Sequence, residues 1–247
     1  GLLPTLYALQ RFSGVAPGPV AIVAPANGSD LFETILGQLP ALWPGLRILR
    51  LRPFETARAD DAIYCRGHFR NKELSLAFPE ALEQAKTLFR AAYRPAAGTT
   101  PSRLYIRRGV TRVRRVHGED ELAERLRLAG FNILTPDWTN HREQFNLAAN
   151  ARFIAGVHGA GLTNCLWAAA GATLCEIMAF DARKRCYLNA AAEARLNYLP
   201  MFGGPEQDRQ NFAIDAPALA SQIIAAADRA CLGGHAVPSR APASGRA

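Results

Sequence analysis

Short apolar runs alternate with segments of helical periodicity between residues 104 and 178, and this alternation constrains the fold more than any other feature of the sequence. The expected strands are residues 104–106, 131–134, 152–157 and 172–178, and the expected helices are residues 119–129, 139–149 and 161–170. Glycines or capping residues punctuate these segments, with Thr139 as the expected cap of the second helix. Repeated strand–helix units form a parallel sheet with right-handed crossovers and helices on both faces. We therefore predict an α/β fold.

The rest of the chain carries weaker signals of the same kind. Strands are expected at residues 19–24, 46–51, 62–65 and 196–202, and helices at residues 30–42, 78–93, 183–194 and 217–230. The Pro/Gly/Thr cluster at residues 95–101 cannot continue a helix and is the expected linker. We predict an amino-terminal α/β domain over residues 1–98, incomplete in this chain, a second α/β domain over residues 99–232, and a disordered tail over residues 233–247.

Composition narrows the classes of function. No run of about 18 apolar residues occurs, so we expect a soluble protein. The net charge is +8 and comes almost entirely from arginine, which suits nucleoside diphosphates, anionic glycans or an acidic membrane face equally well. Nucleic acid is disfavoured, because the richest basic run, residues 103–115, has only Tyr105 as a stacking platform. The five cysteines are scattered, odd in number and never spaced as CxxC, which favours buried reduced thiols in a reducing compartment over a zinc site or disulfides. We therefore expect a cytoplasmic protein.

The most informative local motif is FIAGVHGAGLTN at residues 153–164, an apolar strand that ends in a histidine and glycines. Glycines let an anion approach the backbone, and amides at a helix start carry partial positive charge. The spacing is neither a dinucleotide fingerprint nor a P-loop. His158 stands where open α/β sheets bind ligands, at the carboxyl end of a strand. We interpret the bend as an anion cradle; a purely structural glycine turn with a structural histidine is the alternative.

The order of motifs around this bend resembles glycosyltransferase family 61. The elements that carry the resemblance are an arginine pair after a strand (Arg107, Arg108), an acidic helix start (residues 119–121), Glu143 with Gln144, the HGAGLTN bend (residues 158–164), and a strand ending in Glu176 and Ile177. The resemblance covers residues 75–180. It departs from the family pattern at residues 116–120, where His117 and Gly118 stand in place of the usual Asn before the acid, so no role is carried over to His117.

The resemblance implies an inverting transfer of a sugar from a nucleoside diphosphate sugar to a glycan hydroxyl, by two Rossmann-like domains in the GT-B arrangement. Because no DxD motif is present, we expect the leaving diphosphate to be stabilised without a metal or other cofactor. The expected donor-binding residues are Arg107, Arg108, Gly159, Ala160, Gly161, Thr163, Asn164 and Glu176. His158 is the expected catalytic residue, because histidine can bind the diphosphate or take the acceptor proton.

Several assignments stay open. Glu176 can hold a ribose diol, or it can cap a helix or pair with an arginine. Asp30, His68 and Asp137 are alternative bases by position, and the turn at residues 27–30 is either a helix cap or part of the acceptor site. The rival functions are a non-catalytic nucleotide or anionic-glycan binder and a nucleic-acid binder. High Ala and Arg usage with little Lys suggests a bacterial source, where surface polysaccharide assembly at the inner membrane face is the natural setting, with peripheral membrane association.

Overall fold

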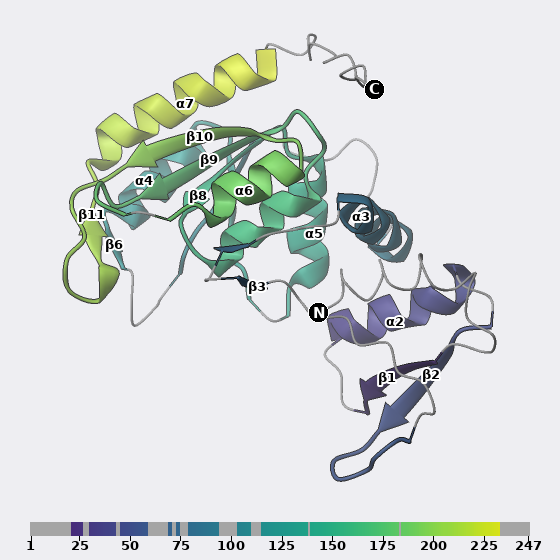
Figure 1. Ribbon diagram of the computed structural model, residues 1–247. Coiled ribbons are helices and arrows are strands. Elements are labelled where there is room, and N and C mark those ends of the chain that lie inside the picture. Colours follow the sequence, from purple (N-terminus) through teal and green to yellow (C-terminus); the bar gives the residue numbers. More distant parts are fainter. Residues whose placement is uncertain are drawn as a thin grey trace, which may run out of the picture.

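The computed structural model is an α/β protein built on a five-stranded parallel sheet (Figure 1). It describes residues 21–26, 30–42, 45–58, 69–70, 73–74, 79–93, 103–109, 115–137, 139–182 and 184–232. The sheet strands are β5 (Arg103–Ile106), β7 (Asn132–Leu134), β8 (Phe153–Val157), β9 (Thr173–Met178) and β10 (Asn197–Phe202). The surrounding helices are α4 (Glu119–Leu128), α5 (His141–Asn150), the 3₁₀ helix η1 (Ala160–Trp167), α6 (Cys186–Glu193) and α7 (Ala216–Leu232). The predicted parallel sheet is confirmed.

The order in which strands are added to the sheet reverses at its middle, although all the strands are parallel. The order is β10-β9-β8-β5-β7, so the chain builds outward from β5 to β7, returns past β5 to β8, and then builds the other way. β5 and β8 are hydrogen-bonded neighbours, with Ile106 opposite Gly156. The residues that follow these two strands therefore leave the sheet at one edge. A reversal of this kind opens a crevice beyond the carboxyl ends of the strands, where α/β sheets bind ligands.

Helices cover both faces of the sheet, as the alternating pattern predicts. Phe153, Ala155 and Val157 of β8 pack in the core under α4 and α7, whereas Ile154 packs in the core formed with α5, η1 and α6. All four residues are buried, so β8 is covered on both sides. This burial explains why its sequence is a continuous apolar run instead of an alternating one.

The described part of the amino-terminal region is also α/β. It contains β1 (Ala21–Pro25), α2 (Asp30–Leu42), β2 (Arg47–Leu51) and α3 (Pro79–Tyr93), and β1 pairs with β2 in parallel. A short antiparallel pair, β3 (Phe69–Arg70) and β4 (Glu73–Leu74), lies between β2 and α3 in the chain. Phe89 and Tyr93 of α3 pack against Phe145 of α5 and, through Phe89, against Trp167. The predicted strand at residues 62–65, the linker at residues 95–101 and the tail at residues 233–247 lie outside the described residues.

Three details of the prediction are wrong or incomplete. The expected α-helix at residues 161–170 is the 3₁₀ helix η1, in which the Leu162 amide donates to the Gly159 carbonyl oxygen at 3.0 Å. Thr139 does not cap α5, because its hydroxyl donates to Asp137 Oδ1. The sequence pattern also misses β6 (Val116–His117) and β11 (Phe212–Ala213), a two-residue parallel pair too short to show a period. None of the helices in the described part of the chain is long and apolar enough to cross a membrane.

Candidate functional site

The arginine pair and the glycine bend meet at the reversal of strand order. Arg107 and Arg108 follow β5, and His158 and Gly159 follow β8. Arg108 Nη1 donates a hydrogen bond to the carbonyl oxygen of His158 at 2.7 Å. Two segments 50 residues apart in the chain are thus joined at the sheet edge where a ligand is expected.

Gly159 is required here by close packing instead of by an unusual backbone angle. Its φ of 166° is extended, but a Cβ at this position would lie 1.9 Å from Arg108 Nη1. The guanidinium therefore rests directly against the backbone of the bend. In the described part of the chain, no acceptor bonds the amides of Gly159, Ala160 or Gly161. These amides and the Arg108 guanidinium can together stabilise an anion.

His158 is held from behind by a buried carboxylate. Its Nδ1 is hydrogen-bonded to Oε1 of Glu176, whose side chain is fully buried. Oε2 of Glu176 accepts a hydrogen bond from the Tyr198 hydroxyl at 2.5 Å. Burial, followed by the bond to Glu176, raises the pKa of Tyr198, so this phenol stays protonated as a donor. The pairing fixes the ring of His158 and leaves Nε2 as the nitrogen without a partner among the described residues.

Tyr187 of α6 secures the other side of the bend. Its ring packs edge-on against the His158 ring, with centroids 5.4 Å apart, and its hydroxyl donates to the Gly159 carbonyl oxygen. The Thr163 hydroxyl lies 3.2 Å from the same phenol oxygen. Sequence reasoning places Tyr187 in a helix and Tyr198 in a strand but gives neither a role, because nothing in their spacing marks them as neighbours of His158.

A second buried carboxylate organises the turn that carries the arginines. Glu119 Oε1 accepts hydrogen bonds from the Arg108 amide at 2.8 Å and from the Tyr105 hydroxyl at 3.2 Å. Arg107 points elsewhere, since its Nη2 pairs with Asp120 at the start of α4. Burial raises the pKa of Glu119, and the bond from the Arg108 amide only partly opposes this shift. Arg108 is therefore the arginine of the pair that the fold turns toward His158.

Glu119 affects stability in two ways, as a hydrogen-bond acceptor and as a buried ionisable group, and two variants should separate these effects. Glu119→Ala should lower the free energy of unfolding by about 1–3 kcal/mol, because the Tyr105 hydroxyl and the Arg108 amide lose their acceptor. Glu119→Gln keeps an acceptor oxygen. Because the folded-state pKa of Glu119 is raised, the stability it contributes is present below its unfolded pKa and is lost as pH rises through the folded value.

The measurement is urea unfolding of wild type and both variants from pH 4 to 8. Relative to wild type, Glu119→Gln should gain stability as pH rises through the raised pKa of Glu119. A wild-type advantage over Glu119→Gln that increases toward pH 8 would contradict this interpretation.

Other expected donor-binding residues have partners inside the protein. Asn164 Nδ2 donates to the Gly161 carbonyl oxygen at 2.9 Å and to Gln144 Oε1 at 3.0 Å. Gln144 Nε2 in turn donates to the Asp137 carbonyl oxygen at 2.7 Å. Asn164 and Gln144 thus tie η1 to the start of α5, and this bond shapes the bend from within. Contact between Asn164 or Thr163 and a donor stays a prediction.

Two further assignments look different in the structure. A ribose contact by Glu176 would require the bonds to His158 and Tyr198 to open, because both carboxylate oxygens are engaged and buried. Among the residues that the structure describes, Glu176 bonds neither a helix N-terminus nor an arginine. Asp137 Oδ1 accepts from the Thr139 hydroxyl and amide, which lowers the pKa of Asp137 and makes it a weak base. His68 lies outside the described residues, as does the side chain of Asp30.

The cysteines stand apart from this chemistry. Cys165 and Cys175 are buried free thiols, and burial raises the pKa of each to about 12, which makes them poor nucleophiles. Cys186 is a half-buried free thiol, Cys231 is also half-buried, and Cys65 lies outside the described residues. No cluster of three His, Cys, Asp or Glu side chains that could hold a metal occurs in the described residues.

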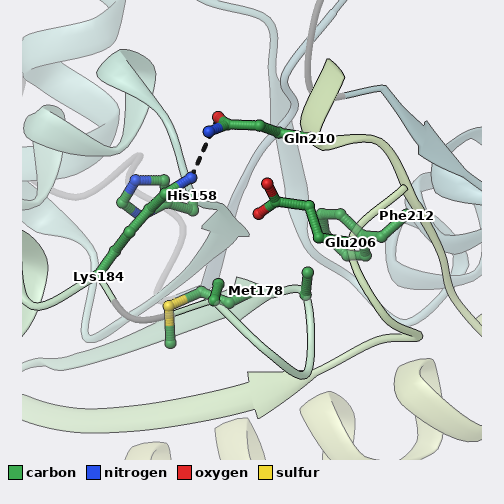
Figure 2. Close-up of a pocket in the computed structure, with 8 residues that line it drawn as sticks. His158, Met178, Lys184, Glu206, Gln210 and Phe212 are labelled. Carbon is green, nitrogen blue, oxygen red and sulfur yellow. Dashed lines mark hydrogen bonds between the residues drawn. The ribbon is translucent and has the colours of Figure 1, made fainter. Parts of the chain in front are cut away.

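A pocket opens in front of His158 at the ends of β8 and β9 (Figure 2). Met178 and Phe212 contribute apolar surface, and Lys184, Glu206 and Gln210 contribute polar groups. Figure 2 shows the last three side chains turned toward one another beside the histidine, and Lys184 Nζ donates to Gln210 Oε1 at 3.3 Å. The site thus combines the glycine bend with the Arg108 guanidinium, a fixed histidine and a small pocket at one edge of the sheet.

Comparison with known proteins agrees with this geometry. A protein-family model, Glycosyltransferase 61, matches residues 11–175, about two thirds of the chain. The match includes Arg107, Arg108, the glycine bend and β8, and it reaches Cys175, next to Glu176. No curated protein matches the chain.

Proposed function

Because the chain belongs to glycosyltransferase family 61 and is a glycosyltransferase, we propose that it transfers a sugar from a nucleoside diphosphate sugar to a glycan hydroxyl with inversion of the anomeric carbon. The observation that carries the proposal is the meeting of Arg108 and the Gly159 backbone beside His158, at the reversal of strand order. A cationic group and unbonded amides suit a leaving diphosphate, and a fixed histidine beside them suits an acceptor hydroxyl.

In the proposed mechanism, the acceptor oxygen attacks the anomeric carbon as the bond between that carbon and the diphosphate oxygen breaks. The diphosphate leaves with the electron pair, and its growing charge is stabilised by Arg108 and by the amides of Gly159, Ala160 and Gly161. Nε2 of His158 accepts the acceptor proton, while Nδ1 donates to Glu176, which stabilises the imidazolium that forms. A single displacement from the face opposite the leaving group inverts the anomeric configuration.

The broader setting belongs to the same proposal. The parallel β1–β2 pair with α2 supports a second Rossmann-like unit in the amino-terminal region, and thus a GT-B arrangement with the acceptor side formed there. The excess of arginine supports an anionic glycan acceptor or an acidic membrane face as a partner. We place the enzyme in surface polysaccharide synthesis on the cytoplasmic side, and we propose that no metal is needed, because Arg108 and backbone amides supply the positive charge.

The test combines binding and product formation. We expect one of UDP, GDP, CDP or ADP to bind the full chain in calorimetry, and the corresponding nucleotide sugars to yield a glycoside of inverted configuration by NMR. Addition of EDTA should leave the rate unchanged. Retention of configuration would refute the single displacement, loss of rate in EDTA would refute metal independence, and absence of nucleotide binding would refute the donor class.

A further inference from the structure

The small parallel sheet of the amino-terminal region has one covered face and one open face. Ile22, Ala24 and Ile48 pack in the core formed with α2 and α3, which covers the first face. Side chains alternate between the faces of a strand, so Val23 and its register partner Leu49 lie on the open face. Val23 is 54% exposed and Leu49 is 37% exposed. Parallel sheets are normally covered on both faces, so the open face is a surface where a partner is expected.

The turn that follows β2 holds an aromatic ring in solvent. In residues 52–55 the Glu55 amide donates to the Arg52 carbonyl oxygen at 3.0 Å, and the Arg52 amide donates to Glu55 Oε2 at 2.7 Å. Phe54 has a φ of 71°, in the left-handed region that favours glycine, and it is fully exposed. Figure 1 shows this turn beyond the arrow of β2, at the end of the molecule away from the five-stranded sheet. The two hydrogen bonds thus hold the ring at a protruding, strained position.

Exposed arginines surround this apolar surface. Arg47 lies on the open face, and Arg52 and Arg58 flank the turn. In the described part of the chain, no carboxylate pairs with any of the three. Arg50 differs, because it lies on the covered face and pairs with Glu33 of α2. Residues 45–58 contain four arginines and one acid, a net charge of +3, so the surface is positive as well as apolar.

A protruding aromatic ring, an apolar sheet face and exposed arginines together suit the surface of an anionic membrane. Aromatic rings are enriched at the level of lipid headgroups, and guanidinium groups form bidentate hydrogen bonds to phosphate. Each arginine near an anionic lipid surface adds to the attraction. A second copy of the chain suits this surface less well. A two-fold interface would place the surface against itself, and the arginines would then meet like charges.

We propose that the open face of β1 and β2, together with the turn at residues 52–55, docks the protein on an anionic lipid surface. Phe54 inserts among the headgroups, and Arg47, Arg52 and Arg58 bind lipid phosphates. The inference deepens the proposed function by naming the surface that meets the membrane, and its test needs no sugar transfer. The charged part of the contact is screened by salt, so docking weakens as ionic strength rises.

The experiment is co-sedimentation of the full chain with vesicles made of equal parts of phosphatidylglycerol and phosphatidylcholine, and with vesicles of phosphatidylcholine alone. Phe54→Gly removes the ring and places glycine where the turn has a positive φ, so the melting temperature should not fall. Its affinity for the anionic vesicles should fall by about 10-fold or more. Leu128→Ala is the matched control, because Leu128 of α4 is also an exposed apolar residue, and it should leave vesicle affinity unchanged.

A charge-matched pair of double variants tests the arginines. Arg47→Gln/Arg52→Gln should weaken binding to the anionic vesicles by about 10- to 30-fold. Arg125→Gln/Arg127→Gln lowers the net charge by the same amount, but these arginines of α4 are paired with glutamates, so vesicle affinity should change far less. Equal losses in the two double variants would mean that net charge alone drives binding, and the docking surface would be incorrect.

The remaining outcomes separate the occupants. Failure of wild type to sediment with the anionic vesicles would overturn the inference, and so would binding that Phe54→Gly leaves unchanged. A dimer seen by sedimentation velocity without lipid, and dissociated by Phe54→Gly, would assign the open face to a second copy instead. Nucleotide calorimetry on the same preparation distinguishes this failure from that of the proposed function. A chain that binds nucleotides but no vesicles keeps its donor class and loses only the docking surface.

Discussion

Replacing His158 with alanine should lower kcat by about 10²- to 10⁴-fold, the range that a positioned general base contributes. The reason is the geometry on its two sides: Nδ1 is bonded to buried Glu176, and Nε2 has no partner in the described part of the chain. Glu176→Gln should also reduce kcat by about 10²-fold or more, because the neutral amide cannot stabilise the imidazolium and can favour the wrong tautomer. Tyr198→Phe should have a smaller effect, since it removes one of the bonds that hold Glu176.

Steady-state kinetics with saturating donor and acceptor measures these changes. His117→Ala is the matched control, because His117 is an exposed histidine of β6 whose substitution should leave kcat unchanged. If His158 only binds the ground-state diphosphate, its loss would raise KM for the donor and leave kcat intact. That outcome would remove the proposed base and leave His158 as a donor ligand.

The sheet could be predicted from sequence because its strands are buried on both faces. In a strand–helix alternation, a short continuous apolar run such as residues 153–157 predicts a buried strand. Gly130 and Gly171, both with positive φ, mark where the preceding segments end. The strand order could not be predicted, because periodicity says nothing about which strands are neighbours. The pairing of β5 with β8, which brings Arg108 to His158, is visible only in the folded chain.

The hydrogen bonds of the site could not be predicted from the sequence either. The sequence marks Glu176 as a polar residue in a buried strand, and it leaves open whether the carboxylate binds a ribose diol, caps a helix or pairs with an arginine. Its partners come from the bend that follows β8 and from the edge strand β10, so the hydrogen bonds with His158 and Tyr198 depend on tertiary packing. The 3₁₀ geometry of η1 could not be predicted either, because its sequence is compatible with both types of helix.

Replacing Gly159 with alanine should abolish tight donor binding without unfolding the protein. The new Cβ would overlap Arg108 Nη1, which is the end of a flexible side chain and can move aside. The backbone at position 159 is extended, so alanine adds no conformational strain there. The cost therefore falls on the position of the guanidinium, which loses its bond to the His158 carbonyl oxygen. We expect kcat/KM to fall by about 10²- to 10³-fold, as when one donor to a developing anion is removed.

Arg108→Ala should cause a loss of similar size, and the double variant Arg108→Ala/Gly159→Ala should be no worse than Arg108→Ala alone, because both changes remove the same interaction. Calorimetric titration of the nucleotide and initial rates measure the cycle, and thermal melts should differ little among the variants. Gly37→Ala is the matched control: a Cβ added to Gly37 in α2 would meet nothing within 4 Å, so activity should be retained. Additive losses in the double variant would mean that Gly159 acts on the donor independently of Arg108, and the arrangement of guanidinium and bend that supports the transfer mechanism would then be incorrect.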